Sequence, residues 1–168
     1  MYKDIHIKKY DSLRELCNVN NLTREDIYGN LLEVNNRFWL ITVDDIKLPI
    51  TYCEYGIEPK IQYAQKSNVL VIGFEKKLMI FDIVSKQLID EKVLQSVFYT
   101  FLFHEAEDCI VIVCELDVLV IDIHGNIIWD IGFHDIVTDY QIIDNKLIIN
   151  SADGDITHYA IKDGTILV

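Results

Sequence analysis

The chain has 168 residues, of which 51% are hydrophobic and 25% are charged, and its formal net charge is −12. Its length and apolar content allow a sizeable core and exclude a chain that stays disordered, so we expect a single domain over residues 1–168. The strongly negative charge disfavours binding to nucleic acids and to anionic membranes, since both carry arrays of phosphate groups.

The first 28 residues differ in pattern from the rest of the chain. They begin with charged residues and no apolar stretch, so a secretory leader is not expected. Ser12 and Thr23 each begin an S/T-x-x-D/E pattern, which is typical of the start of a helix. We therefore predict a helical N-terminal segment over residues 1–28, with one or two short helices, followed by β-structure over residues 29–168.

The rest of the sequence repeats a pattern of short apolar strands and polar turns. Three similar segments begin at Val69, Ile110 and Leu147, and each contains three strands. A further β-rich stretch precedes each segment, at residues 60–64, 97–103 and 136–143. A looser copy has strands at 30–34, 37–43 and 46–52, and its fourth strand is missing near Gly56 and Pro59.

Four antiparallel strands that recur about every 40 residues are typical of β-propeller blades. The sequence therefore predicts an all-β fold of repeated four-stranded antiparallel blades, propeller-like, with about four units. Four blades is a small number for a closed ring, so the sequence leaves open a closed ring, an open stack, a monomer and a small homo-oligomer.

Parts of three repeats resemble known propeller families. VIDIHGNIIWDIGF, residues 120–133, resembles a blade of quinoprotein-type propellers, and FDIVSKQLIDEKV and HYAIKDGTILV resemble WD-repeat and quinoprotein blades. The resemblance extends over roughly residues 37–168. It implies propeller architecture and assigns no functional residue.

Negative charge is concentrated in the second half of the chain. No Lys or Arg occurs between Lys92 and Lys146, whereas this stretch contains ten acidic residues: Glu105, Glu107, Asp108, Glu115, Asp117, Asp122, Asp130, Asp135, Asp139 and Asp144. Such a field attracts cationic proteins. It also favours solubility, and charge alone does not choose between these two roles.

The turns that join second to third strands are acidic in every repeat. Propellers present binding groups on turns at one face, so we predict an acidic partner-binding face there. Its candidate residues are Asp44, Asp45, Glu75, Glu115, Asp117, His134, Asp135, Asp153 and Asp155. Acidic residues are also common in turns because they hydrogen-bond the local backbone, which is the alternative explanation.

The sequence has no pattern typical of catalysis. It contains no GxSxG or GxGxxG motif, and its five histidines lack metal-ligand spacing. Its four cysteines have no CxxC spacing, which favours buried thiols in a reducing compartment. We therefore expect a cytoplasmic protein that is not an enzyme, with no metal and no cofactor.

A small acidic protein without catalytic residues resembles, by type, the bacterial immunity proteins of contact-dependent growth inhibition and polymorphic toxin systems. That resemblance implies a cationic protein partner, a toxin nuclease domain, neutralised by tight binding through the acidic surface. A propeller-like scaffold or adaptor protein is the alternative interpretation, and a small-ligand-binding propeller is a third.

Overall fold

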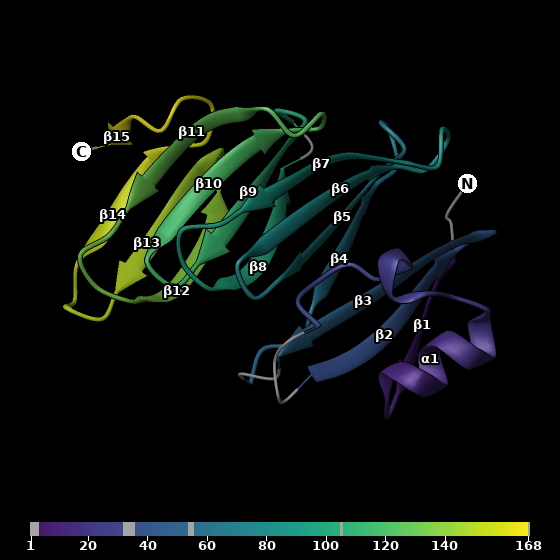
Figure 1. The fold of residues 1–168 in the computed structure, drawn as a ribbon. Helices are drawn as coiled ribbons and strands as arrows, with labels where there is room; N and C mark the ends of the chain where they lie inside the picture. The colour runs from purple at the N-terminus through teal and green to yellow at the C-terminus, as the bar shows by residue number, and fades with distance from the viewer. Residues whose placement is uncertain (1–3, 32–35, 54–55, 105, 168) are drawn as a thin grey trace.

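The computed structural model describes residues 4–31, 36–53, 56–104 and 106–167. They form four antiparallel sheets stacked in chain order, with strands adjacent in sequence paired side by side (Figure 1). The first sheet contains β1 (Ile5–Tyr10), β2 (Asn36–Val43) and β3 (Ile46–Cys53). The second contains β4 (Lys60–Ala64), β5 (Val69–Phe74), β6 (Lys77–Asp82) and β7 (Gln87–Val93). The third contains β8 (Phe98–His104), β9 (Cys109–Cys114), β10 (Asp117–Asp122) and β11 (Ile127–Gly132). The fourth contains β12 (Val137–Ile143), β13 (Lys146–Ser151), β14 (Ile156–Ala160) and β15 (Ile166–Leu167).

The predicted all-β fold of repeated four-stranded blades is therefore confirmed for three sheets. Strands in the middle of the stack are apolar on both sides, as β5 (VLVIGF) and β9 (CIVIVC) show, and both are buried at every position. Strand β7 lies at the outer edge and alternates between exposed and half-buried residues. The sequence pattern thus distinguishes strands between two neighbouring sheets from strands at the rim.

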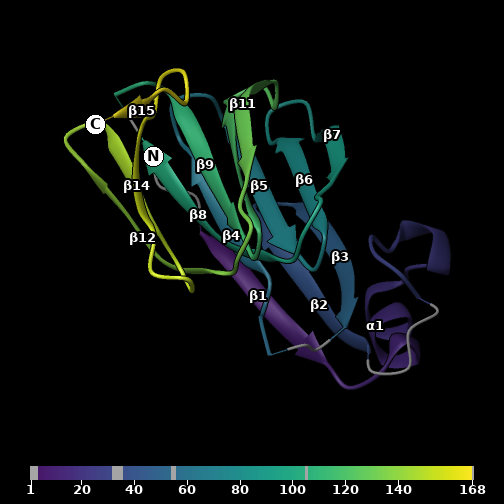
Figure 2. The ribbon, with the colours of Figure 1, turned by 90° about the vertical axis from the view of Figure 1, so that its left-hand side faces the viewer.

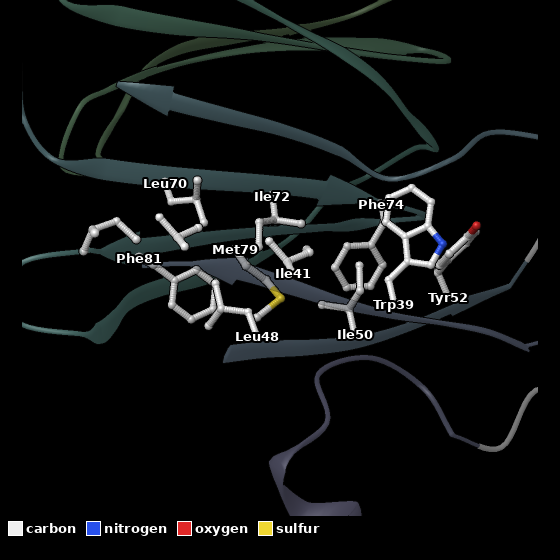
Figure 3. Close-up of a cluster of buried hydrophobic side chains, with 12 residues drawn as sticks. Trp39, Ile41, Leu48, Ile50, Tyr52, Leu70, Ile72, Phe74, Met79 and Phe81 are labelled. Carbon is white, nitrogen blue, oxygen red and sulfur yellow. The ribbon is translucent and has the colours of Figure 1, made fainter. Parts of the chain in front are cut away.

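Three apolar clusters hold neighbouring sheets together. One joins the first and second sheets around Ile41, Ile50, Ile72 and Met79 (Figure 3). The second cluster joins the second and third sheets, and another joins the third and fourth. Among the described residues, no apolar cluster joins the fourth sheet to the first, and the two views show an open stack (Figures 1 and 2).

The first sheet contains a strand that the sequence analysis assigned to a helical segment. The expectation for residues 1–28 holds for α1 (Leu13–Asn20) and for the single 3-10 turn η1 (Arg24–Asp26), but not for β1. Strand β1 pairs antiparallel with β2 and completes a three-stranded sheet. The strand expected at residues 30–34 falls mostly on 32–35, outside the described residues.

Helix α1 begins where the capping pattern predicts. The Ser12 hydroxyl accepts a hydrogen bond from the Glu15 amide at 3.1 Å, and Asn21 ends the helix in a left-handed conformation. The helix packs its buried Leu16 against Tyr10 and Leu40. It therefore covers the face of the first sheet that points away from the second sheet (Figure 1).

The first sheet is also offset by one strand from the repeat that the sequence suggests. Asp45, in the β2–β3 turn, forms an ion pair with Lys86 in the β6–β7 turn. At the other end of the sheet, the Cys53 amide donates to the carboxylate of Glu75 in the β5–β6 turn. Strand β3 thus runs in the same direction as β5, so β1, β2 and β3 correspond in direction to the second, third and fourth strands of a blade.

The outer edge of β3 is protected although no full strand lies beside it. Tyr28 bridges β3 in parallel, donating its amide to the Pro49 carbonyl at 2.9 Å and accepting from the Thr51 amide at 2.8 Å. Pro49 has no N–H to offer on this edge. Gly29 has φ of +115°, and a Cβ there would lie 2.0 Å from the Thr51 oxygen, so only glycine allows the chain to approach so closely. These features leave the edge poorly suited to pairing with another strand.

A close contact between the second and third sheets yields a test of the stacking. A Cβ added to Gly73 in β5 would lie 2.5 Å from the ring of Phe98, which is fully buried. We expect Gly73→Ala to lower the free energy of unfolding by about 1–3 kcal/mol, because a packed core does not accept the extra methyl group without strain. Chemical denaturation measures the change.

Gly132→Ala is the matched control. Gly132 is also a strand glycine, but it is exposed at the end of β11, and a Cβ there meets only the Leu116 oxygen, at 3.9 Å. We expect no loss of stability for this variant. Equal destabilisation by both substitutions would contradict the close contact between β5 and Phe98.

Candidate protein-binding surface

The turns β5–β6, β9–β10 and β13–β14 lie at the same end of the stack, together with the connections from each sheet to the next (Figure 1). Backbone hydrogen bonds tie the connections from the second sheet to the third and from the third to the fourth to these turns. The Leu94 amide donates to the Lys76 carbonyl at 2.8 Å, Phe133 donates to Leu116 at 2.7 Å, and Ala152 donates to Ile136 at 2.8 Å. This end of the molecule is therefore a continuous hydrogen-bonded surface.

We call this surface the acidic end, and seven of the nine candidate residues lie on it. They are Glu75, Glu115, Asp117, His134, Asp135, Asp153 and Asp155. The other two, Asp44 and Asp45, lie at the opposite end of the stack, where Asp45 pairs with Lys86. Their predicted place beside the others was wrong because the first sheet is offset by one strand.

Two of the seven side chains stabilise the structure. The half-buried Glu75 accepts a hydrogen bond from the Cys53 amide and so joins the first sheet to the second. Asp117 accepts a hydrogen bond from the Ser96 hydroxyl, whose oxygen in turn accepts from the Leu116 amide at 2.9 Å. The two partners in each contact are 22 and 21 residues apart, so these carboxylates join distant segments and are not explained by bonding to their own turn.

The β13–β14 turn does show the local hydrogen bonding that is common for acidic turn residues. Asp153 accepts hydrogen bonds from the Ser151 hydroxyl at 2.7 Å and from the Asp155 amide at 3.1 Å. The hydrogen bond from Ser151 is the main cause that lowers the pKa of Asp153, and the nearby His134 also lowers it. His134 and Asp153 thus lie on the same end of the stack, near enough for their charges to interact.

Glu115 and Asp155 are different, because their carboxylates accept no hydrogen bond from any described residue. Asp155 is exposed and Glu115 is half-buried. Burial raises the pKa of Tyr99, and the negative charge of Glu115 raises it further. These two carboxylates are thus available to a partner without loss of an internal contact.

The negative charge of the acidic end is balanced over the second sheet but not over the third and fourth. Over the second sheet, the β5–β6 turn carries Lys76 next to Glu75, and Lys77 and Lys92 pair with Glu91 and Asp90 of β7 at 2.5 Å each. The third sheet, the connection to the fourth and strand β12 contain no Lys or Arg, because none occurs between Lys92 and Lys146. The field that attracts cations is therefore concentrated over the third and fourth sheets.

A shallow hollow of about 320 Å³ lies beside the acidic end, between the rims of the second and third sheets. Its wall includes the side chain of Lys92, the carboxylates of Asp117 and Asp130, and the aliphatic side chains of Val93, Leu119 and Ile127. Val93 is 81% exposed and Ile127 is 54% exposed. This site was not among the residues predicted from the sequence. The feature that could have indicated it is the presence of apolar residues, Val93 and Ile127, at exposed positions of the rim strands.

Among the residues that the structure describes, no group of three or more His, Cys, Asp or Glu side chains is arranged to hold a metal ion. In the same residues, no helix has the length and apolar character needed to cross a membrane.

The comparisons with known proteins support the fold. No family model matches the chain, and no curated protein matches it. Solved structures do match: the BamB protein from Moraxella catarrhalis has a TM-score of 0.53 at 15% identity, over 87% of this chain and 49% of that one. The Sqt1 protein from Saccharomyces cerevisiae has a TM-score of 0.55 at 11% identity, over 82% of this chain and 45% of that one.

Two computationally designed proteins are similar as well. Ika8 has a TM-score of 0.54 at 20% identity, over 82% of this chain and 46% of Ika8. Ika4 has a TM-score of 0.51 at 18% identity, over 83% of this chain and 99% of Ika4. The chain thus has a propeller-like fold and spans about half the length of BamB, Sqt1 and Ika8.

The turns at the opposite end offer a test of the local role of acidic residues. Burial of Asp122 opposes ionisation, but hydrogen bonds from the Asn126 side chain and from the amides of Asn126 and His124 outweigh it and lower the pKa below 3.8. The ionised carboxylate therefore stabilises the fold above the ordinary carboxyl pKa, and this contribution is lost as pH falls through the lowered value.

We expect Asp122→Asn to destabilise the protein near neutral pH, with a difference from the wild type that shrinks as the pH falls below 3.8. Denaturation at a series of pH values measures it. Asp155→Asn is the control and leaves stability unchanged. A difference for Asp122→Asn that persists unchanged in acid would contradict the role of the ionised carboxylate.

The cysteines of β9 provide a second test. Burial, followed by the charges of Glu107 and Asp108, raises the pKa of Cys109 to about 11. Burial is also the main cause that raises the pKa of Cys114. At pH 8 the thiolate fraction of Cys109 is then on the order of one in a thousand, which leaves it unreactive.

We expect iodoacetamide to modify the half-buried Cys17 of the folded protein much faster than Cys109 and Cys114. The two β9 thiols become reactive only when the protein is unfolded, because both lie in the core. Peptide mass mapping measures the three rates. Rapid labelling of Cys109 in the folded protein would show that the interface between the third and fourth sheets is open.

Proposed function

We propose that this chain is a protein-binding module with a propeller-like fold whose acidic end binds a cationic protein. The observation that carries the proposal is the unbalanced negative charge over the third and fourth sheets. Glu115 and Asp155 lie there on turns held by backbone hydrogen bonds, so their charges are presented on a rigid surface. A preorganised field of this kind accelerates encounter with a positively charged partner.

The hollow between the second and third sheets supports the same proposal. Its aliphatic wall suits the apolar stem of a Lys or Arg side chain, and its two carboxylates suit the cationic head. Lys92 also lines the hollow, but its charge is paired with Asp90. A basic side chain inserted between Val93 and Ile127 would cover exposed apolar surface and place its charge near Asp130. The hollow would then be the anchor of the interface, and the acidic turns would steer the approach.

Within this function, we propose that the chain is an immunity protein and that its partner is the nuclease domain of a bacterial toxin. Nuclease domains that bind RNA or DNA carry a cationic cleft for the phosphate backbone. An array of carboxylates spaced by the stacking of sheets, about 10 Å from one to the next, offers such a cleft a substitute for phosphates. Binding there would neutralise the toxin by blocking access of the nucleic acid.

The test is co-expression with the C-terminal domain of the protein encoded by the adjacent gene, scored by whether that domain is toxic and whether this chain rescues growth. Binding of the purified domain is then followed by association rate at low and high salt. We expect Glu115→Lys/Asp155→Lys to slow association by roughly tenfold or more, and added salt to weaken wild-type binding.

Glu115→Lys and Glu107→Lys form a matched pair on the third sheet. Both make the same change in charge, but Glu107 is exposed in the β8–β9 turn at the opposite end. We expect Glu115→Lys to slow association and Glu107→Lys to leave it nearly unchanged. Equal effects would mean that only net charge matters, and the acidic end would lose its assignment. If the chain binds a cationic protein that is not a nuclease, the proposed protein-binding function is supported, whereas the proposed immunity function is contradicted.

A further inference from the structure

The outer face of the fourth sheet is not covered by any described element. The register of β12, β13 and β14 places Ile143, Ile148, Ile156 and Leu167 on this face. Ile156 is 63% exposed and Ile143 is 47% exposed. In Figure 2, which is turned toward this side of the stack, no described segment lies in front of the sheet. An apolar sheet face of this kind is a candidate interface.

The same positions are buried in the other sheets. Ile156 corresponds to Leu78 in the second sheet and Val118 in the third, and both of these are fully buried against the next sheet. Ile148 corresponds in the same way to Val71 and Val111, which are also fully buried. The fourth sheet thus keeps two of the aliphatic side chains by which one sheet contacts the next.

The remaining positions of this face are polar. Lys146, Asn150 and His158 stand where the second and third sheets have small or apolar residues. A face that mixes central isoleucines with polar groups is typical of an interface between molecules that also exist apart, whereas a permanent core is more apolar. The composition therefore favours a reversible contact.

The two ends of the stack are not equivalent. Helix α1 covers the outer face of the first sheet, with Leu16 fully buried against it. A second molecule therefore cannot place its fourth sheet flat on that face without displacing the helix. The fourth sheet has no such cover. A contact between two copies through this one open face is consequently symmetric and closed, as a twofold axis requires.

We propose that the outer face of the fourth sheet is the interface of a twofold homodimer, in which this face of one copy packs on the same face of the other. The charges on the face support a second copy of the chain as the partner, because Asp139 and Lys146 lie at opposite ends of the face. A twofold axis perpendicular to the strands brings Lys146 of one copy to the end where Asp139 of the other copy lies. The two resulting ion pairs then border the contact between the isoleucines.

The size of the face sets the strength of the dimer. With the ordinary spacing of strands and residues, the face measures roughly 15 Å by 20 Å, so two copies together cover on the order of 600 Å². That area is small for a specific interface, and we expect a weak dimer with a dissociation constant of about 0.1–1 mM. Each copy carries a net charge of −12, so the copies repel each other and added salt strengthens the dimer.

The first experiment measures molar mass by sedimentation over a range of protein concentrations. We expect a monomer–dimer equilibrium, and we expect Ile156→Glu to raise the dissociation constant at least about tenfold, because it replaces a contacting aliphatic side chain by a negative charge in the row that already contains Asp139. Ile127→Glu is the matched control, since Ile127 is an isoleucine of similar exposure on the third sheet. Circular dichroism confirms that both variants fold.

The second experiment exchanges the charges. Lys146→Asp and Asp139→Lys each give like charges at both ends of the twofold contact, so each variant alone is expected to be monomeric. Mixed together, the two variants are expected to form a heterodimer, because each Asp then meets a Lys. A monomer at every concentration, or a dimer that tolerates Ile156→Glu, would overturn the proposal.

The salt response separates this interface from the proposed function. Added salt strengthens the dimer and weakens the binding of a cationic protein at the acidic end. If Glu115→Lys does not slow association with the cationic partner, the proposed dimer is not affected by that result. If Ile156→Glu does not weaken the dimer, the proposed binding function of the acidic end is not affected.

Discussion

The packing of one apolar sheet face on the next is the interaction on which the structure depends. A four-stranded sheet that is apolar on both sides needs a neighbour on each side, and the aliphatic strands β5 and β9 are buried completely between such neighbours. Shape matters as well as hydrophobicity. Gly73 leaves the space that the Phe98 ring fills, so the second and third sheets fit closely. Stability in this arrangement comes from contacts between adjacent sheets, as in other repeat proteins.

In an open stack, the two end faces have no neighbouring sheet to cover their apolar side chains. The two end faces of this protein differ in how these side chains are covered. At the first sheet, α1 buries the outer face and Tyr28 closes the edge of β3. At the fourth sheet, polar residues replace some of the aliphatic ones, yet Ile148 and Ile156 remain. The first solution resembles the caps of repeat proteins, and the second leaves a face that can be covered reversibly.

The acidic turns combine a local role with a long-range one. Asp117 accepts a hydrogen bond from the Ser96 hydroxyl, and Asp153 accepts hydrogen bonds from the Ser151 hydroxyl and the Asp155 amide. Their charges still contribute to the field at the acidic end, because a hydrogen-bonded carboxylate keeps its charge. Glu115 and Asp155 add charge without such internal bonds. The same turns therefore contribute to stability and to the proposed binding. We expect substitutions of Asp117 and Asp153 to affect both, and substitutions of Glu115 and Asp155 to affect mainly binding.

The sequence by itself determined the repeat, the strands and the acidic character of the turns, since strand period, turn residues and charge are local properties. It also gave the equivalence of Leu78, Val118 and Ile156, which the register confirms. Only the tertiary structure decided that β1 belongs to the first sheet and that Asp44 and Asp45 lie apart from the other candidates. The direction of a strand in the stack depends on which distant segments pair with it, and a local pattern carries no record of that pairing. The hollow between Val93 and Ile127 arises likewise from two strands far apart in the chain.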